Sequence, residues 1–96
     1  MTYHLPDRII YEITKYARAH HIQKIILFGS RANGTNTERS DIDIAVSGGD
    51  FDAFYWDIKE NVDSLLMFDV VDLDSGVSDE LTNEINRNGV IIYEKA

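Results

Sequence analysis

The chain has 96 residues, of which 17 are acidic and nine are Lys or Arg, so its formal net charge is −8. This length fits one domain over residues 1–96, and the lack of cysteine excludes disulfides, thiolate zinc sites and cysteine nucleophiles. The acidic balance opposes binding to a phosphate backbone, so we expect no long nucleic acid as a partner. The sequence shows neither a basic leader nor an apolar run of about 20 residues, so we expect a cytoplasmic protein without a membrane partner.

The first half of the chain predicts a helix and two strands. Apolar residues recur at helical spacing after Pro6, which predicts an amphipathic helix over about residues 6–20. An apolar run at residues 24–28 predicts a buried strand. Residues 41–46 alternate carboxylates with aliphatic side chains, which is typical of a strand with one polar and one buried face.

The second half predicts two helices and two further strands. Asp50 is a suitable cap for a helix whose core-facing residues are Phe51, Phe54, Tyr55, Ile58 and Val62. A strand over about residues 66–73 follows. Ser78 is a suitable cap for a short helix that ends at Gly89, where we expect a left-handed cap conformation. Residues 90–93 predict the last strand, so the chain is expected to form an α/β, or α+β, domain with helices packed on a small mixed sheet.

The strongest chemical pattern begins with Gly29-Ser30 at the end of the first strand. Ten residues later come Asp41 and Asp43, which lie on the same face of the next strand. Glycine allows close approach of the backbone to a phosphate, and Ser30 adds a hydroxyl donor. Magnesium is commonly bound by one or two carboxylates together with substrate phosphates, so the pattern predicts a metal and nucleotide site.

A displacement with two metal ions usually requires another carboxylate. The predicted strand at residues 66–73 offers Asp69 and Asp72, which point to opposite faces. We favour Asp69 because it lies deeper in the apolar run, and Asp72 stays open as the alternative.

At this point, GSRANGTNTERSDIDIAV resembles the nucleotidyltransferase superfamily that includes kanamycin nucleotidyltransferases and DNA polymerase beta. The short length is similar to its minimal branch, the MNT proteins. The resemblance continues through FDVVDLDSGVSDELTNEINRNGVIIYE and covers nearly the whole chain. It implies the nucleotidyltransferase fold.

The resemblance also implies roles for individual residues. Gly29 and Ser30 would hold the triphosphate of ATP, the nucleotide donor. Catalysis and the binding of magnesium, as two ions, would depend on three carboxylates: Asp41, Asp43 and Asp69. Arg31 could contact phosphate or could be a solvated helix charge, and Asn33 replaces an arginine often found in this branch, which implies lower nucleotide affinity.

Larger relatives carry an added helical domain for their acceptor, so we expect the acceptor to come from a partner. MNT proteins similar to this chain act with HEPN proteins, as antitoxins that transfer AMP to a tyrosine of the HEPN ribonuclease. The resemblance thus implies a magnesium-dependent protein adenylyltransferase in a toxin–antitoxin pair, as a homo- or hetero-oligomer. Two alternatives stay open: a nucleotide-binding regulator that inhibits by occlusion, and a subunit of an antibiotic adenylyltransferase.

Two further features predict contacts outside this pattern. Trp56 falls off the core stripe of its helix, so we expect partial exposure and consider a role in partner binding. His20 and His21 lie at the end of the first helix, where we expect them to interact with terminal carbonyls and not in catalysis.

Overall fold

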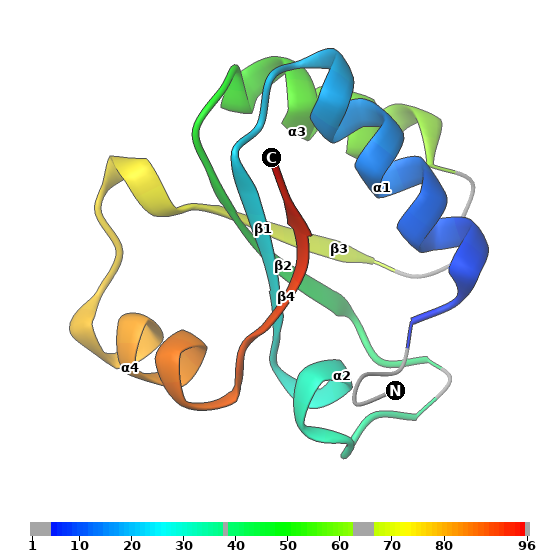
Figure 1. Cartoon of the computed structure of the whole chain (residues 1–96). Coiled ribbons are helices and arrows are strands. Elements are labelled where there is room, and N and C mark those ends of the chain that lie inside the picture. Colours follow the sequence, from blue (N-terminus) through cyan, green and yellow to red (C-terminus); the bar gives the residue numbers. More distant parts are fainter. Residues whose placement is uncertain (1–4, 38, 63–66, 96) are drawn as a thin grey trace.

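The computed structural model describes residues 5–37, 39–62 and 67–95. Its elements follow in the order α1 (Asp7–Ala19), β1 (Lys24–Phe28), α2 (Ser30–Asn33), β2 (Ile42–Ser47), α3 (Phe51–Asn61), β3 (Phe68–Asp72), the 3-10 turn η1 (Leu73–Ser75), α4 (Asp79–Asn88) and β4 (Val90–Glu94). The predicted mixed α/β architecture is confirmed (Figure 1). The strand predicted over residues 66–73 ends one residue earlier because Leu73 begins the 3-10 turn, and Leu66 lies outside the described residues.

The four strands form one sheet in the order β3-β2-β1-β4. Strand β1 pairs antiparallel with both β2 and β4, whereas β2 and β3 are parallel. The end of β1 therefore lies at the same end of the sheet as the starts of the other three strands. Phe28, Ile42, Phe68 and Val90, which are far apart in sequence, are thus brought to one end of the sheet.

Helices cover the two faces of the sheet unequally (Figure 1). Helices α1 and α3 lie on one face, where Ile42, Ile44 and Phe54 belong to the larger core cluster. Helix α4 lies on the other face, where Ile85 packs with Phe28 and Ala45. The alternation of β2 thus sends its isoleucines into the larger core and its odd-numbered residues toward the α4 face.

The predicted starts of α3 and α4 are confirmed by side-chain caps. The Oδ1 of Asp50 accepts a hydrogen bond from the Ala53 amide at 3.2 Å, and the Ser78 hydroxyl accepts one from the Leu81 amide at 3.2 Å. Such caps satisfy amides that have no partner within the helix.

The left-handed conformation predicted for Gly89 is wrong. Its φ of −68° and ψ of 145° are extended, because the chain passes directly from α4 into β4. A β-carbon at this position would lie 2.6 Å from Ile26 Cγ2 and would also meet the Ile85 carbonyl oxygen. Close packing, and not backbone freedom, favours glycine here.

Two predictions on the outer surface have different outcomes. Trp56 is 59% exposed, which confirms its predicted position off the core. His20, expected at a terminal carbonyl, instead directs its Nε2 to the carboxylate of Asp57 on α3. Within the described ranges, no helix has the length and apolar character needed to cross a membrane.

Candidate active site

Gly29 marks the point where β1 ends and the chain turns into α2. Its φ of 74° and ψ of −156° lie in a region that residues other than glycine rarely adopt. A β-carbon there would collide with Oδ2 of Asp43. Glycine is therefore required both by its own backbone and by the carboxylate that lies against it.

Strand β2 places Asp43 on the α4 face, opposite the buried Ile42 and Ile44. Asp43 pairs with Phe28 of β1 in the antiparallel register, which explains its position beside Gly29. Asp41 precedes the strand by one residue and is exposed. The Gly-Ser turn and Asp43 therefore meet, although 12 residues separate Ser30 from Asp43 in sequence.

The parallel pairing of β2 with β3 distinguishes the two candidates for a third carboxylate. Asp69 is directly opposite Asp43 in the register, whereas Asp72 is opposite Val46 near the other end of β2. The carboxylate of Asp72 instead accepts a hydrogen bond from the Asp74 amide at 3.0 Å and caps the 3-10 turn. The geometry thus favours Asp69.

The electrostatics of Asp43 reflect this crowding. Burial is the largest cause, followed by the nearby charges of Asp69, Asp41 and Glu84, and together they raise the pKa of Asp43 to about 6. Each cause disfavours the charged form of the carboxyl group. These four residues, Asp41, Asp43, Asp69 and Glu84, are named the acidic end of the sheet.

Glu84 was not among the residues singled out from the sequence. It lies on α4, one residue before the buried Ile85 that packs against Phe28. An acidic residue on a polar helix carries no local pattern that would separate it from a solvated charge. Only the packing of α4 on the sheet shows that Glu84 reaches the electrostatic environment of Asp43.

Arg31 is 4% exposed, so its interpretation as a solvated helix charge is wrong. Its Nε donates a hydrogen bond to the Ser40 carbonyl at 3.1 Å, which fixes the backbone directly before Asp41. Asn33 also has a structural role, since its Oδ1 accepts hydrogen bonds from the amide and hydroxyl of Thr35 at 3.1 and 2.6 Å. Both side chains shape the loop that leads from the Gly-Ser turn to the aspartates.

The donor chemistry of the acidic end fits magnesium. Carboxylate oxygens are its preferred protein ligands, and it usually takes one or two of them together with waters and phosphates. Within residues 5–37, 39–62 and 67–95, no three acidic or histidine side chains form a ready-made metal group.

Comparison with known proteins agrees with this geometry. The family described as Polymerase beta, Nucleotidyltransferase matches residues 11–96. The chain belongs to this nucleotidyltransferase family. A search of curated proteins found no match.

Among solved structures, this nucleotidyltransferase is similar to antitoxin complexes. A toxin–antitoxin crystal structure with AMP-PNP is 32% identical, with a TM-score of 0.71 over 90% of this chain and 73% of the other. The toxin–antitoxin MntA-HepT is 25% identical, with a TM-score of 0.65 over 94% and 74% of the two chains. The predicted resemblance to the minimal, MntA-like branch is confirmed.

Proposed function

We propose that this nucleotidyltransferase is an antitoxin that transfers AMP from ATP to a hydroxyl group of a HEPN-type toxin and depends on magnesium. The observation that carries the proposal is the meeting of Gly29, Asp43 and Asp69 at one end of the sheet. The solved relatives support the biological setting, because they are toxin–antitoxin complexes and one contains AMP-PNP.

Each residue of the proposed site has a chemical role. The Gly29-Ser30 turn would bind the triphosphate, with the Ser30 hydroxyl as a donor. Asp41 and Asp43, joined by Asp69, would hold magnesium, which when bound would offset the negative charge of the phosphates and of the transition state. Arg31 is proposed to position the loop before Asp41 through Ser40, in place of a direct phosphate contact.

The proposed reaction is an in-line attack at the α-phosphorus. The acceptor oxygen forms a bond to this phosphorus while the bond to the bridging oxygen breaks, and pyrophosphate leaves. The proton of the acceptor hydroxyl passes to the carboxylate of Asp69, which acts as the general base. No covalent intermediate on the chain is needed, so a stable nucleotidyl-enzyme in a rapid-quench experiment would contradict this route.

The test is a pair of matched substitutions in β3. Asp69→Asn should abolish AMP transfer to the purified toxin, while Asp72→Asn, which removes a negative charge from the same strand but keeps an oxygen that can cap the 3-10 turn, should retain it. Transfer is measured as AMP mass on the toxin, and toxin inhibition is measured in parallel. If Asp69→Asn loses no transfer, the assignment is wrong; if wild type inhibits the toxin without any mass gain, the chain acts by occlusion.

A further inference from the structure

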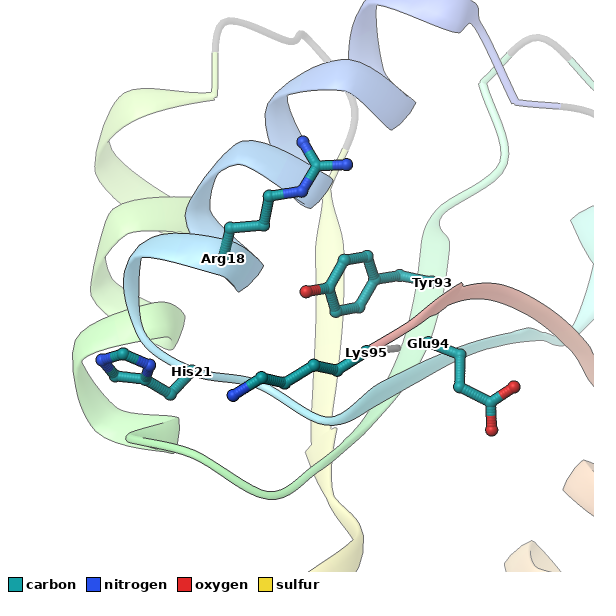
Figure 2. A pocket seen from close by; sticks show the side chains of 5 residues that line it. All are labelled: Arg18, His21, Tyr93, Glu94 and Lys95. Carbon is teal, nitrogen blue, oxygen red and sulfur yellow. The ribbon is translucent and has the colours of Figure 1, made fainter.

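The end of the sheet opposite the acidic site contains a cavity of about 390 Å³ (Figure 2). Its lining comes from the last turn of α1, the loop that follows it, and the end of β4: Arg18, His21, Tyr93, Glu94 and Lys95. Two segments more than 70 residues apart in sequence therefore form one concave surface.

Backbone hydrogen bonds fix the two walls of this cavity. The Ile22 amide bonds to the Ala17 carbonyl at 2.9 Å and closes the turn after α1, in which His21 has a φ of 62°. The Lys95 amide bonds to the Gln23 carbonyl at 2.8 Å and continues the pairing of β4 with the chain beside it. The positions from which Arg18, His21 and Lys95 project are thus set by the fold.

The charge of the cavity is opposite to that of the chain. Arg18, Lys95 and His21 surround the hollow, and the Tyr93 hydroxyl points between them (Figure 2). The carboxylate of Glu94 points away from these groups in the same view, and Glu94 lies opposite Lys24 in the register of β4 and β1. Arg18, His21, Tyr93 and Lys95 are named the basic end; they lie in a chain with a net charge of −8.

The basic character continues along the outer face of α1. Arg8, Tyr11, Lys15 and Arg18 recur at spacings of three and four residues, so they form one stripe on the helix. This stripe lies opposite the buried Ile9, Ile13 and Ala17, and Tyr11 is 69% exposed on it. The acidic residues of the helix, Asp7 and Glu12, fall at the borders of the stripe. One elongated surface therefore combines positive charge with an exposed aromatic ring.

The charged lining of this surface favours an acidic occupant. Three of the five residues that line the cavity, Arg18, Glu94 and Lys95, carry charge, and the two cations outnumber the one carboxylate. Oppositely charged surfaces of two proteins steer and orient their association, and exposed tyrosine and arginine are frequent at such interfaces.

We propose that the basic end and the outer stripe of α1 form the docking site for an acidic segment of the toxin partner, with a carboxylate side chain entering the cavity. The existence of this partner rests on the proposed function. Strand β1 separates the two ends by five residues, roughly 17 Å at strand spacing. An acidic segment bound at the basic end leaves the acidic end accessible to the acceptor hydroxyl.

The first test compares two charge reversals of the same size. Arg18→Glu should weaken binding of the purified HEPN-type toxin about tenfold in calorimetry at low salt and should reduce the salt dependence of binding. Arg87→Glu, at an exposed position near the end of α4, is the matched control and should change affinity less than about twofold. Equal effects of the two substitutions, or no effect of Arg18→Glu, would overturn the proposal. Thermal unfolding midpoints show whether the Arg18→Glu and Arg87→Glu variants are folded. If Arg18→Glu is not folded, Arg18→Gln is tested in its place.

A second test does not require the toxin. The labelled chain is titrated with a glutamate-rich peptide and, separately, with inorganic phosphate, and amide shifts are followed by NMR. The peptide should shift the resonances of Arg18, His21 and Lys95 in wild type but not in Arg18→Glu. No peptide shifts, or shifts with phosphate alone, would overturn the proposal, the latter in favour of a small-anion site.

The two proposals fail in different ways. If Arg18→Glu transfers AMP to the toxin with unchanged KM, the docking surface is wrong and the proposed function stands. If the toxin binds through Arg18 but gains no AMP, the docking surface stands and transfer is wrong. Asp43→Asn should lose nucleotide-dependent stabilisation but keep the peptide-induced NMR shifts. This one variant therefore distinguishes nucleotide binding at the acidic end from peptide binding at the basic end.

Discussion

The acidic and basic ends of the sheet differ in how their residues come together. Gly29, Asp41 and Asp43 are close in sequence, and one antiparallel pairing joins them. Arg18 and Lys95 come from opposite ends of the chain and meet only because β4 pairs with β1. The first arrangement is visible as a motif, whereas the second exists only in the folded sheet. Because the two proposed sites lie at the two ends of one strand, a variant at one end serves as a control for a variant at the other.

The largest expected effect is at the acidic end. Asp43→Asn removes the carboxylate that lies between Gly29 and Asp69, so transfer should fall on the order of 10²–10³-fold, the loss typical when one preorganised electrostatic group is removed. AMP transfer to the toxin is measured under single-turnover conditions. Arg87→Glu should stay within a few-fold of wild type, and an Asp43→Asn variant with wild-type turnover would exclude Asp43 from the site.

Ligand binding should separate the two ends through stability. Magnesium with ATP at about 100 times Kd should stabilise the folded chain by about 2.7 kcal/mol, an increase in Tm on the order of 10 °C for a domain of this size. Asp43→Asn should lose this shift and Arg18→Glu should keep it, because only the first substitution alters the carboxylates. Loss of the shift in both variants would mean that the two ends are not independent.

Two glycines provide a comparison within the acidic end. Gly29 and Gly34 both have positive φ, 74° and 83°, but only at Gly29 would a β-carbon meet Asp43, while at Gly34 no atom lies within 4 Å. Gly34→Ala should cost about 1 kcal/mol of unfolding free energy, the backbone cost alone. Gly29→Ala should cost about 1–3 kcal/mol and should also reduce transfer, because Asp43 must move. Urea unfolding measures both, and equal losses would contradict the close packing of Asp43 on Gly29.

The smallest expected effect is on stability as a function of pH. The folded chain raises the pKa of Asp43 from 3.8 to about 6, so between these values the folded state binds more protons than the unfolded state. The stability contribution of this group is therefore complete below pH 3.8 and is lost as the pH rises through about 6. Asp43 is partly solvated, so the effect should be well below the full linkage value. Unfolding between pH 4 and 7 without magnesium should show a shallower decline in Asp43→Asn, and parallel profiles would contradict the raised pKa.

The sequence predicted α1, α3, α4, the four strands and the acidic motif because these depend on local patterns, whereas the short α2 and the 3-10 turn were not predicted. Periodic apolar residues predicted α1 and α3. The alternation in β2 predicted that Asp43 lies on the opposite face from Ile42 and Ile44. The choice of Asp69 over Asp72 followed from apolar context, and the parallel register of β2 and β3 gives it a geometric reason.

The features that sequence reasoning did not predict depend on tertiary packing. Glu84 approaches Asp43 only because α4 folds onto the sheet. Arg31 is buried by the loop that returns to Ser40, and His20 faces Asp57 because α1 and α3 lie side by side. Gly89 is required by Ile26, which is 63 positions away in the chain. None of these contacts leaves a periodic trace in the sequence.

The most direct test of the account is incubation of the purified chain and its toxin with α-labelled ATP and magnesium. Wild type is compared with the double variant Asp41→Asn, Asp43→Asn, and both are checked for folding. We expect a labelled toxin band with wild type only, with AMP located on a hydroxyl side chain by mass spectrometry. No label with wild type, despite nucleotide binding and toxin inhibition, would contradict transfer and would support inhibition by occlusion.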